Sequence, residues 1–296
     1  MKVVGIGGGH GLATTLRAAR KYAARVAAVV TVADDGGSSG RLTVELQIPP
    51  PGDIRNCLVA LSPEGPTSDL FQHRFERGTL EGHALGNLII AALAESTGDF
   101  AEAVLAAGEM LGAEGPVYPA TTELVKLGAI VDGGVVRGQV AVAESRSPIR
   151  SVHLEPSDPP AHPAARAEIL AADQVVIGPG SLFTSVIAPL LIPGIRDALH
   201  DTSAARVFVC NGKRQKGETE GLDVVGHVSA LLRHVGEGVI DHVVMQSPPL
   251  PDGVGIPVEW PFGSIDLVTA DVMSPDGAHQ PDRLAPVLSA LGRHSR

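Results

Sequence analysis

The glycine-rich stretch GIGGGHGL, residues 5–12, has the composition of a phosphate-binding turn. Its glycines lack a β-carbon, so the backbone can turn sharply and come close to a ligand. The amides that open the following helix have no partner within it, and the helix dipole favours an anion there. The spacing fits neither the dinucleotide fingerprint G-x-G-x-x-G nor the Walker loop. We expect backbone contacts to phosphate at Gly7, Gly8, Gly9 and Gly11, and a tight turn without a ligand is the alternative.

A second stretch, ADDGGSSGR at residues 33–41, places two adjacent carboxylates ahead of flexible and hydroxyl residues. Adjacent side chains point in different directions, so one of Asp34 and Asp35 can touch a ribose or a metal while the other organises the loop. A carboxylate about 20 residues past a glycine turn is typical of ribose binding. The Gly/Ser run behind it, with Ser38 and Ser39, better suits a second anion or metal contact. An acidic, solvated turn is the alternative.

Both stretches follow short β-branched runs, at residues 3–4 and 26–32. Between them, Leu12 to Ala24 carries apolar residues near helical spacing. This order of strand, turn, helix and strand opens a nucleotide-binding α/β sheet. Because a right-handed crossover brings both turns to the carboxyl ends of neighbouring strands, we expect the ligand over that edge.

The same pattern returns at residues 174–183, QVVIGPGSLF. We expect Gly180 and Ser181 to form a second phosphate cradle. Ser181 is not in a G-x-S-x-G elbow, which argues against a serine hydrolase. Two cradles in one sheet indicate a diphosphate that spans the point where the strand order reverses.

Three asparagines are candidate contacts to a base or a sugar. Asn56 lies near the start of the helix expected at GDIRNCLVALS, for which Asp53 is the expected N-cap. Asn87 shares a helical face with His83, a weaker candidate. Asn211 ends the buried strand expected at Arg206–Cys210.

A β-rich excursion is expected at about residues 116–157. Leu124–Val131 and Val135–Val142 are β-type runs joined by Asp132-Gly133-Gly134, a hairpin signal, and Ile149–Leu154 supplies a third strand. Such an excursion would serve as a lid or as the contact of a homodimer.

The composition of the chain argues against several classes of function. With 44% hydrophobic and 19% charged residues, the 296-residue chain has enough apolar material for a sizeable core. A net charge of −10 argues against nucleic-acid binding and against anionic membranes. Cys57 and Cys210 read as reduced core residues of a cytoplasmic protein. The N-terminus lacks the pattern of a signal peptide, and no apolar segment is long enough for membrane insertion.

Together the motifs GGG-x-GL, TVADDGGSSGRL, PPGDIRNCLVAL, GHALGNL and VIGPGSLFTSVIAPLLIPGI resemble those of the YvcK family, the gluconeogenesis factor proteins of the CofD-like superfamily. The resemblance weakens after about Asn211. It implies a doubly wound α/β fold, binding of UDP-sugars such as UDP-N-acetylglucosamine, and a role in cell-wall and cell-shape homeostasis during gluconeogenic growth. The related 2-phospholactate transferases are metal-dependent enzymes.

The chain departs from the family pattern at two places that the resemblance links to sugar-nucleotide binding. Ala278 stands where the family has an arginine, and QSPPLPDGVGIPVEWPFG replaces a tyrosine-containing segment. Trp260 or Phe262 would be the replacement stacking surface.

We therefore expect one Rossmann-like, three-layer α/β/α domain over residues 1–296, with a mostly parallel sheet and the small antiparallel excursion. The leading hypothesis is a cytoplasmic, UDP-sugar-binding regulatory protein without a certain cofactor. The alternative is a phosphotransferase in which Asp34 and Asp35 bind Mg²⁺ and act in catalysis. A nicotinamide-dependent enzyme is a third reading, which the misregistered glycines disfavour.

Overall fold

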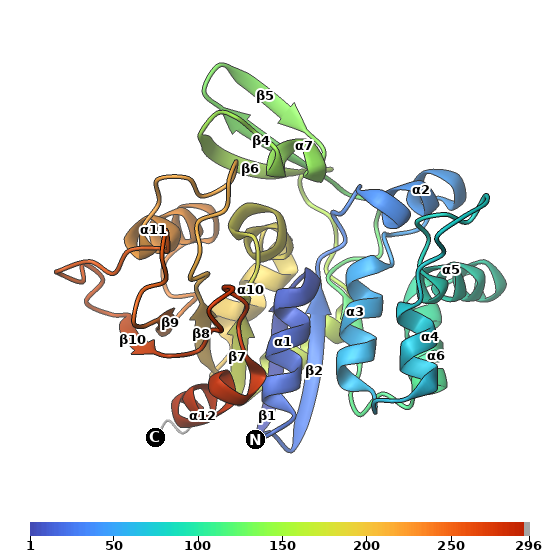
Figure 1. The fold of residues 1–296 in the computed structure, drawn as a ribbon, viewed down its shortest axis with the longest axis horizontal. Helices are drawn as coiled ribbons and strands as arrows, with labels where there is room; N and C mark the ends of the chain where they lie inside the picture. Colours follow the sequence, from blue (N-terminus) through green and yellow to red (C-terminus); the bar gives the residue numbers. More distant parts are fainter. Residues whose placement is uncertain (293–296) are drawn as a thin grey trace.

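The computed structural model describes residues 1–292. The buried β-branched runs of the chain form one parallel sheet (Figure 1). Seven strands lie in the order β10-β9-β8-β7-β1-β2-β3. In that spatial order they are Asp266–Ala270, His242–Gln246, Ala205–Val209, Gln174–Ile177, Lys2–Gly7, Arg25–Val30 and Val117–Pro119. After β1, the next strands β2 and β3 lie on one side of it. After β7, which lies on the other side of β1, the strands β8, β9 and β10 continue in the opposite direction. The order therefore reverses between β1 and β7, as in doubly wound folds.

Helices cover both faces of this sheet, which confirms the predicted three-layer α/β/α architecture. On one face lie α1 Gly9–Ala19, α3 Gly52–Leu61, α4 Pro66–Gln72, α5 Leu85–Thr97, α6 Phe100–Leu111 and α12 Pro281–Leu291. On the other lie α8 Pro163–Leu170, the π-helix η1 Leu182–Ile187, α9 Ala188–Leu190, α10 Pro193–Asp201 and α11 Val224–Val235. Neighbouring residues of β1 point to opposite faces of the sheet. Val3 packs on the face that α1 covers, and Val4 packs on the face that α8 covers. Strands buried on both faces explain the continuous apolar runs in the sequence.

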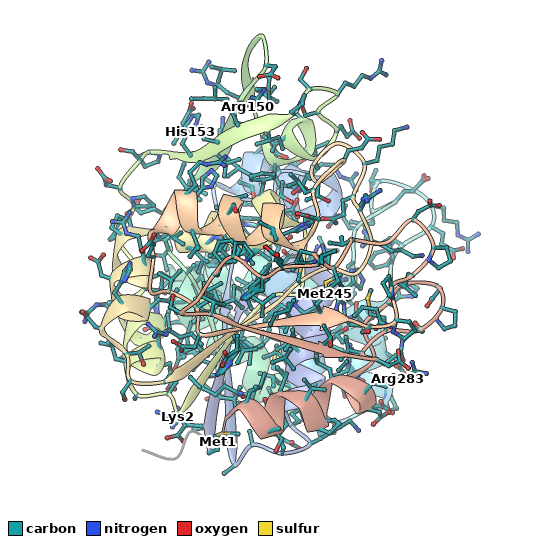
Figure 2. The ribbon with its side chains drawn as sticks, turned by 90° about the vertical axis from the view of Figure 1, so that its left-hand side faces the viewer. Met1, Lys2, Arg150, His153, Met245 and Arg283 are labelled. Carbon is teal, nitrogen blue, oxygen red and sulfur yellow. The ribbon has the colours of Figure 1, made fainter. Side chains whose placement is uncertain are left out.

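The excursion forms a separate antiparallel sheet in the order β5-β4-β6, with strands Gly134–Arg137, Lys126–Val131 and Ile149–Glu155. Figure 2 places its residues Arg150 and His153 at one end of the molecule, with Met1 and Lys2 at the other. Because β1 begins at Lys2, the small sheet stands at the end toward which the parallel strands point.

One predicted strand of the excursion is wrong in its second half. The strand expected at Val135–Val142 ends at Arg137, and Gln139–Ala143 forms the short helix α7. Gly138 has a φ of +99°, which breaks the extended run. The Asp35 carboxylate accepts hydrogen bonds from the amides of Gln139 and Val140, at 3.0 and 2.9 Å. The residue that caps α7 lies about a hundred residues away in the sequence. The sequence around α7 therefore does not indicate that a helix begins there.

Three other local predictions need correction. The helix expected at Leu12–Ala24 begins earlier, at Gly9, and ends at Ala19. The helix α2, Gly37–Leu46, includes Ser38 and Ser39, which were expected in a loop. Asp53 is not the N-cap of α3, because Pro51 holds that position and Asp53 lies in the first turn.

The two cysteines, Cys57 and Cys210, are free and buried, as expected for core residues. Within residues 1–292, no single helix is long and apolar enough to cross a membrane. One helix pair, Leu182–Leu190 with Pro193–Asp201, has sufficient length and composition together but is bent by 76°.

Candidate functional site

The first and third glycine turns meet where the strand order reverses. A β-carbon built at Gly11 would lie 2.1 Å from the carbonyl oxygen of Pro179, so only glycine fits this contact. Thr15 Oγ1 donates a 2.6 Å hydrogen bond to the carbonyl oxygen of Gly178. The turn after β1 and the turn after β7 are therefore packed against each other, although about 170 residues separate them in the sequence.

A pocket of about 380 Å³ opens beside this junction. Its lining comes from four segments that are distant in the sequence: Gly8–Gly11 with Thr14, Pro179–Ser181 with Ser185, Asn211 with Gln215, and Gly277–His279. The pocket brings together Gly8, Gly9, Gly11, Gly180, Ser181 and Asn211 of the predicted ligand contacts. Its C-terminal wall, Gly277–His279, contains Ala278, the position at which the chain departs from the family's arginine, whereas His279 was not predicted as a site residue.

On the α1 side the pocket offers backbone donors. The amides of the first turn of α1 have no acceptor within the helix, and its N-cap Gly8 supplies no side-chain hydrogen bond. Together with the helix dipole, these amides can hold an anion.

On the β7 side the cradle is partly occupied by the protein itself. Glu218 Oε2 accepts from the amides of Phe183 and Thr184, at 3.0 and 3.4 Å, and Oε1 accepts from Thr184 Oγ1 at 2.7 Å. A carboxylate thus caps the start of η1. Single π-type turns within helices are frequent at functional sites. On this side the pocket is lined by Pro179, Gly180, Ser181 and Ser185, and the Ser181 hydroxyl accepts a hydrogen bond from Gln215 Nε2 at 2.8 Å.

One carboxylate, that of Asp53, borders the N-terminus of α1, and it was not predicted as a site residue. Asp53 interacts with the amide of Gly9, and its Oδ2 would lie 2.5 Å from a β-carbon at Gly8. Burial, reinforced by the charge of Asp34, raises the pKa of Asp53 to about 6. Burial also raises the pKa of Asp34, against the lowering effect of the Gly36 amide and the Ser39 hydroxyl. The sequence did mark Asp53, but its place ahead of a helix resembled an ordinary cap.

The remaining predicted residues lie beside this acidic pair. Ser39 Oγ accepts from the Gly52 amide at 3.1 Å, and Asn87 Nδ2 donates to Ser38 Oγ at 3.0 Å. The Oδ1 atom of Asn87 is buried and has no hydrogen-bond partner among the described residues. Asn56 Oδ1 accepts from Arg55 at 2.8 Å.

Asp35 has a different environment from the one expected for a metal ligand, because its two oxygens cap α7. The other carboxylates of this region are Asp34 and Asp53, whose charges act on each other. Within residues 1–292 no group of three or more His, Cys, Asp or Glu side chains could hold a metal. Mg²⁺ commonly binds one or two carboxylates and completes its shell with water and substrate phosphates, so this pair suits it.

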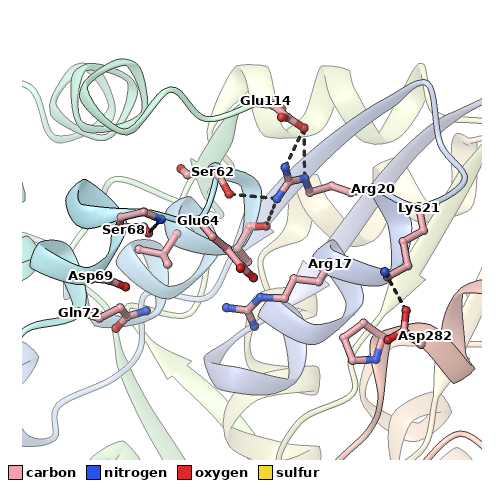
Figure 3. Close-up of a pocket in the computed structure, with 14 residues that line it drawn as sticks. Arg17, Arg20, Lys21, Ser62, Glu64, Ser68, Asp69, Gln72, Glu114 and Asp282 are labelled. Carbon is pink, nitrogen blue, oxygen red and sulfur yellow. Dashed lines mark hydrogen bonds and ion pairs between the residues drawn. The ribbon is translucent and has the colours of Figure 1, made fainter.

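A larger groove of about 790 Å³ lies elsewhere, between the C-terminal part of α1, the segment that runs from the end of α3 into α4, and the start of α12 (Figure 3). Most of its charges neutralise one another. Arg20 bonds to Glu114 and to the carbonyl oxygens of Ala60 and Ser62, and Lys21 pairs with Asp282 at 2.8 Å. It holds neither glycine turn. The smaller pocket at the strand reversal is therefore the better candidate site.

The chain belongs to the CofD family, because the family model described as "2-phospho-L-lactate transferase CofD" matches residues 3–256. Its relatives within that family are gluconeogenesis factors, as the sequence motifs indicated. The gluconeogenesis factor of Halalkalibacterium halodurans is 44% identical over 255 residues, which cover 85% of this chain and 79% of the relative. That of Bacillus subtilis is 45% identical, covering 86% of this chain and 81% of the relative. A putative gluconeogenesis factor of Mycobacterium tuberculosis is 41% identical, covering 98% and 90%.

The fold is also that of a solved relative. The crystal structure of a UPF0052 family protein from Bacillus halodurans is similar with a TM-score of 0.92 and 37% identity, covering 98% of both chains.

Proposed function

We propose that this chain binds a nucleoside-diphosphate sugar of the UDP-N-acetylglucosamine type and acts as a cytoplasmic regulatory protein in cell-shape and cell-wall homeostasis during gluconeogenic growth. The observation that carries the proposal is the junction of Gly11 with Pro179, which joins two glycine turns at the strand reversal beside the pocket. Doubly wound sheets bind their ligands in such a crevice. The relatives named gluconeogenesis factor support the regulatory role.

In this proposal the diphosphate lies against the amides of His10 and Gly11 in the first turn of α1, next to the Gly9 amide that Asp53 occupies. Asn211 contacts the base or the sugar. Asp34 and Asp53 border the diphosphate, where a Mg²⁺ ion would screen two like charges from each other and from phosphate.

A metal-dependent phosphotransferase is a second candidate, favoured by one observation. Asp53, whose charge interacts with that of Asp34, adjoins the N-terminus of α1, and the matching family model is described as a transferase. A metal held by two carboxylates beside a phosphate can stabilise the charge that develops in phosphoryl transfer.

Isothermal titration calorimetry separates the two. The purified chain is titrated with UDP-N-acetylglucosamine, GTP and NAD, each with and without Mg²⁺, and the nucleotide is then recovered and analysed by chromatography. Micromolar binding of the UDP-sugar with intact nucleotide is the expected result. Absence of UDP-sugar binding together with Mg²⁺-dependent consumption of another nucleotide would contradict the regulatory proposal and favour the transferase.

A further inference from the structure

The orientation of the Asn211 amide is determined by its neighbours. Asn211 Nδ2 lies 2.7 Å from the carbonyl oxygen of Gly180 and 3.1 Å from Gln215 Oε1. A backbone carbonyl can only accept a hydrogen bond, so the nitrogen of the side-chain amide must face Gly180. Its donors are thereby used within the protein. What Asn211 presents to the pocket is Oδ1, an acceptor.

His279 adds a second acceptor to the same wall. Its imidazole bonds to the backbone carbonyl of Cys210, the residue next to Asn211, which requires a proton on that nitrogen. Burial lowers the pKa of His279 to about 4, so the ring is neutral at physiological pH. The other nitrogen, Nε2, therefore carries a lone pair. It is buried and has no partner among the described residues.

No cation of this wall is directed at a ligand's phosphate. The Lys213 ammonium bonds to the carbonyl oxygen of Asp276, just before the wall segment Gly277–His279. The exposed side chain of Ala278 has no polar group. The anion-binding donors of the pocket thus lie on the α1 side, and the acceptors lie opposite.

We propose that Asn211 and His279 form a specificity wall that accepts hydrogen bonds from N–H or O–H groups of the nucleoside or sugar, while the α1 amides hold the phosphates. The inference rests on the proposed function. It adds which part of the ligand each side of the pocket binds. Nε2 is shielded from solvent, so a ligand can reach it only after a movement of the exposed turn at Ala278. A ligand with a matching donor gives the buried His279 Nε2 the partner that it lacks, an advantage of about 1–3 kcal/mol over a ligand without one. Sites built on such groups discriminate strongly.

The test compares a nucleotide with its phosphates alone. Wild type, His279→Phe, His279→Gln and Asn211→Ala are titrated with UDP-N-acetylglucosamine, GDP, NAD and inorganic pyrophosphate. His73→Phe is the matched control, since His73 is exposed and does not line the pocket. His279→Phe is expected to weaken binding of the favoured nucleotide roughly tenfold and of pyrophosphate less than twofold. His279→Gln, which keeps a polar oxygen, restores part of the loss.

A direct readout avoids dependence on folding of the variants. The ¹⁵N chemical shift of His279 Nε2 in the wild type should move on addition of the nucleotide and stay unchanged with pyrophosphate. Equal losses for nucleotide and pyrophosphate in His279→Phe, or an unchanged Nε2 shift, would overturn the specificity wall. If GDP or NAD binds and the UDP-sugar does not, the proposal that the ligand is a UDP-sugar is contradicted. The specificity wall is then tested with the nucleotide that binds. If no nucleotide binds more tightly than pyrophosphate, the wall itself is overturned.

Discussion

Asp53 and Gly8 are in direct contact, close enough that a β-carbon at position 8 would stand 2.5 Å from Asp53 Oδ2. The same carboxylate interacts with the amide of Gly9. An acidic side chain of α3 thus lies against the helix N-terminus that is the candidate phosphate site. A phosphate that binds there meets this charge, which a proton or a divalent cation would neutralise.

Replacing Asp53 by Asn should stabilise the protein at neutral pH. The folded-state pKa of Asp53, about 6, is above its ordinary value of 3.8, so its ionisation favours the unfolded chain. Its contribution to stability is complete below about pH 4 and is lost as the pH rises through about 6. Urea unfolding at pH 8 should therefore give Asp53→Asn an advantage of ~1–3 kcal/mol, which disappears near pH 4. A constant difference between the two proteins from pH 4 to 8 would contradict the assignment.

Asp34→Asn and Asp35→Asn should differ in their effect on magnesium. Asp34 adjoins Asp53, whereas Asp35 is used to cap α7. We expect Asp34→Asn to abolish any strengthening of pyrophosphate binding by Mg²⁺, and Asp35→Asn to preserve it. Asp35→Ala, which removes both acceptors of the α7 cap, should lower the free energy of unfolding by about 1 kcal/mol. Calorimetric titration with and without Mg²⁺ measures the first effect and urea unfolding the second. The reverse pattern would make Asp35 the metal ligand.

Gly11→Ala should disrupt the junction of the two glycine turns. The new β-carbon would stand 2.1 Å from the carbonyl oxygen of Pro179, and both groups belong to backbone that is packed on the sheet. We expect a loss of about 3 kcal/mol or more, seen as a lower thermal midpoint or as insoluble protein. Gly263→Ala is the control, because no atom lies within 4 Å of a β-carbon there. Equal midpoints for the two variants would disprove the close contact.

Removing the Glu218 side chain should destabilise η1. In Glu218→Ala the amide of Phe183 and the hydroxyl of Thr184 lose their acceptor inside the protein. Each buried donor left without a partner costs about 1–3 kcal/mol. Equilibrium urea unfolding should show a loss of this size. The exposed neighbour Glu220 provides the control, and Glu220→Ala should stay within about 0.5 kcal/mol of the wild type.

Local pattern was enough to predict the sheet and its turns. The apolar runs at β1, β2 and β7 and the glycines that follow them specify strand-to-helix turns, since burial on both faces and the need for close backbone approach act on neighbouring residues. The crossover rule places the turns after β1 and β2 at one edge, and the structure shows that the turn after β7 meets the turn after β1 there. The same reasoning failed at Val135–Val142, where a distant cap decided between strand and helix.

The sequence by itself determined the fold class, the glycine turns and most residue types of the pocket. Only the tertiary structure assigned the roles of Asp35, Asp53, Glu218 and His279. Adjacent aspartates look alike in the sequence, yet Asp35 caps a helix of the excursion while Asp53, from another helix, approaches Gly8. Each assignment depends on contacts between segments that are tens to hundreds of residues apart. Such contacts follow from how helices pack on the sheet, which no local periodicity encodes.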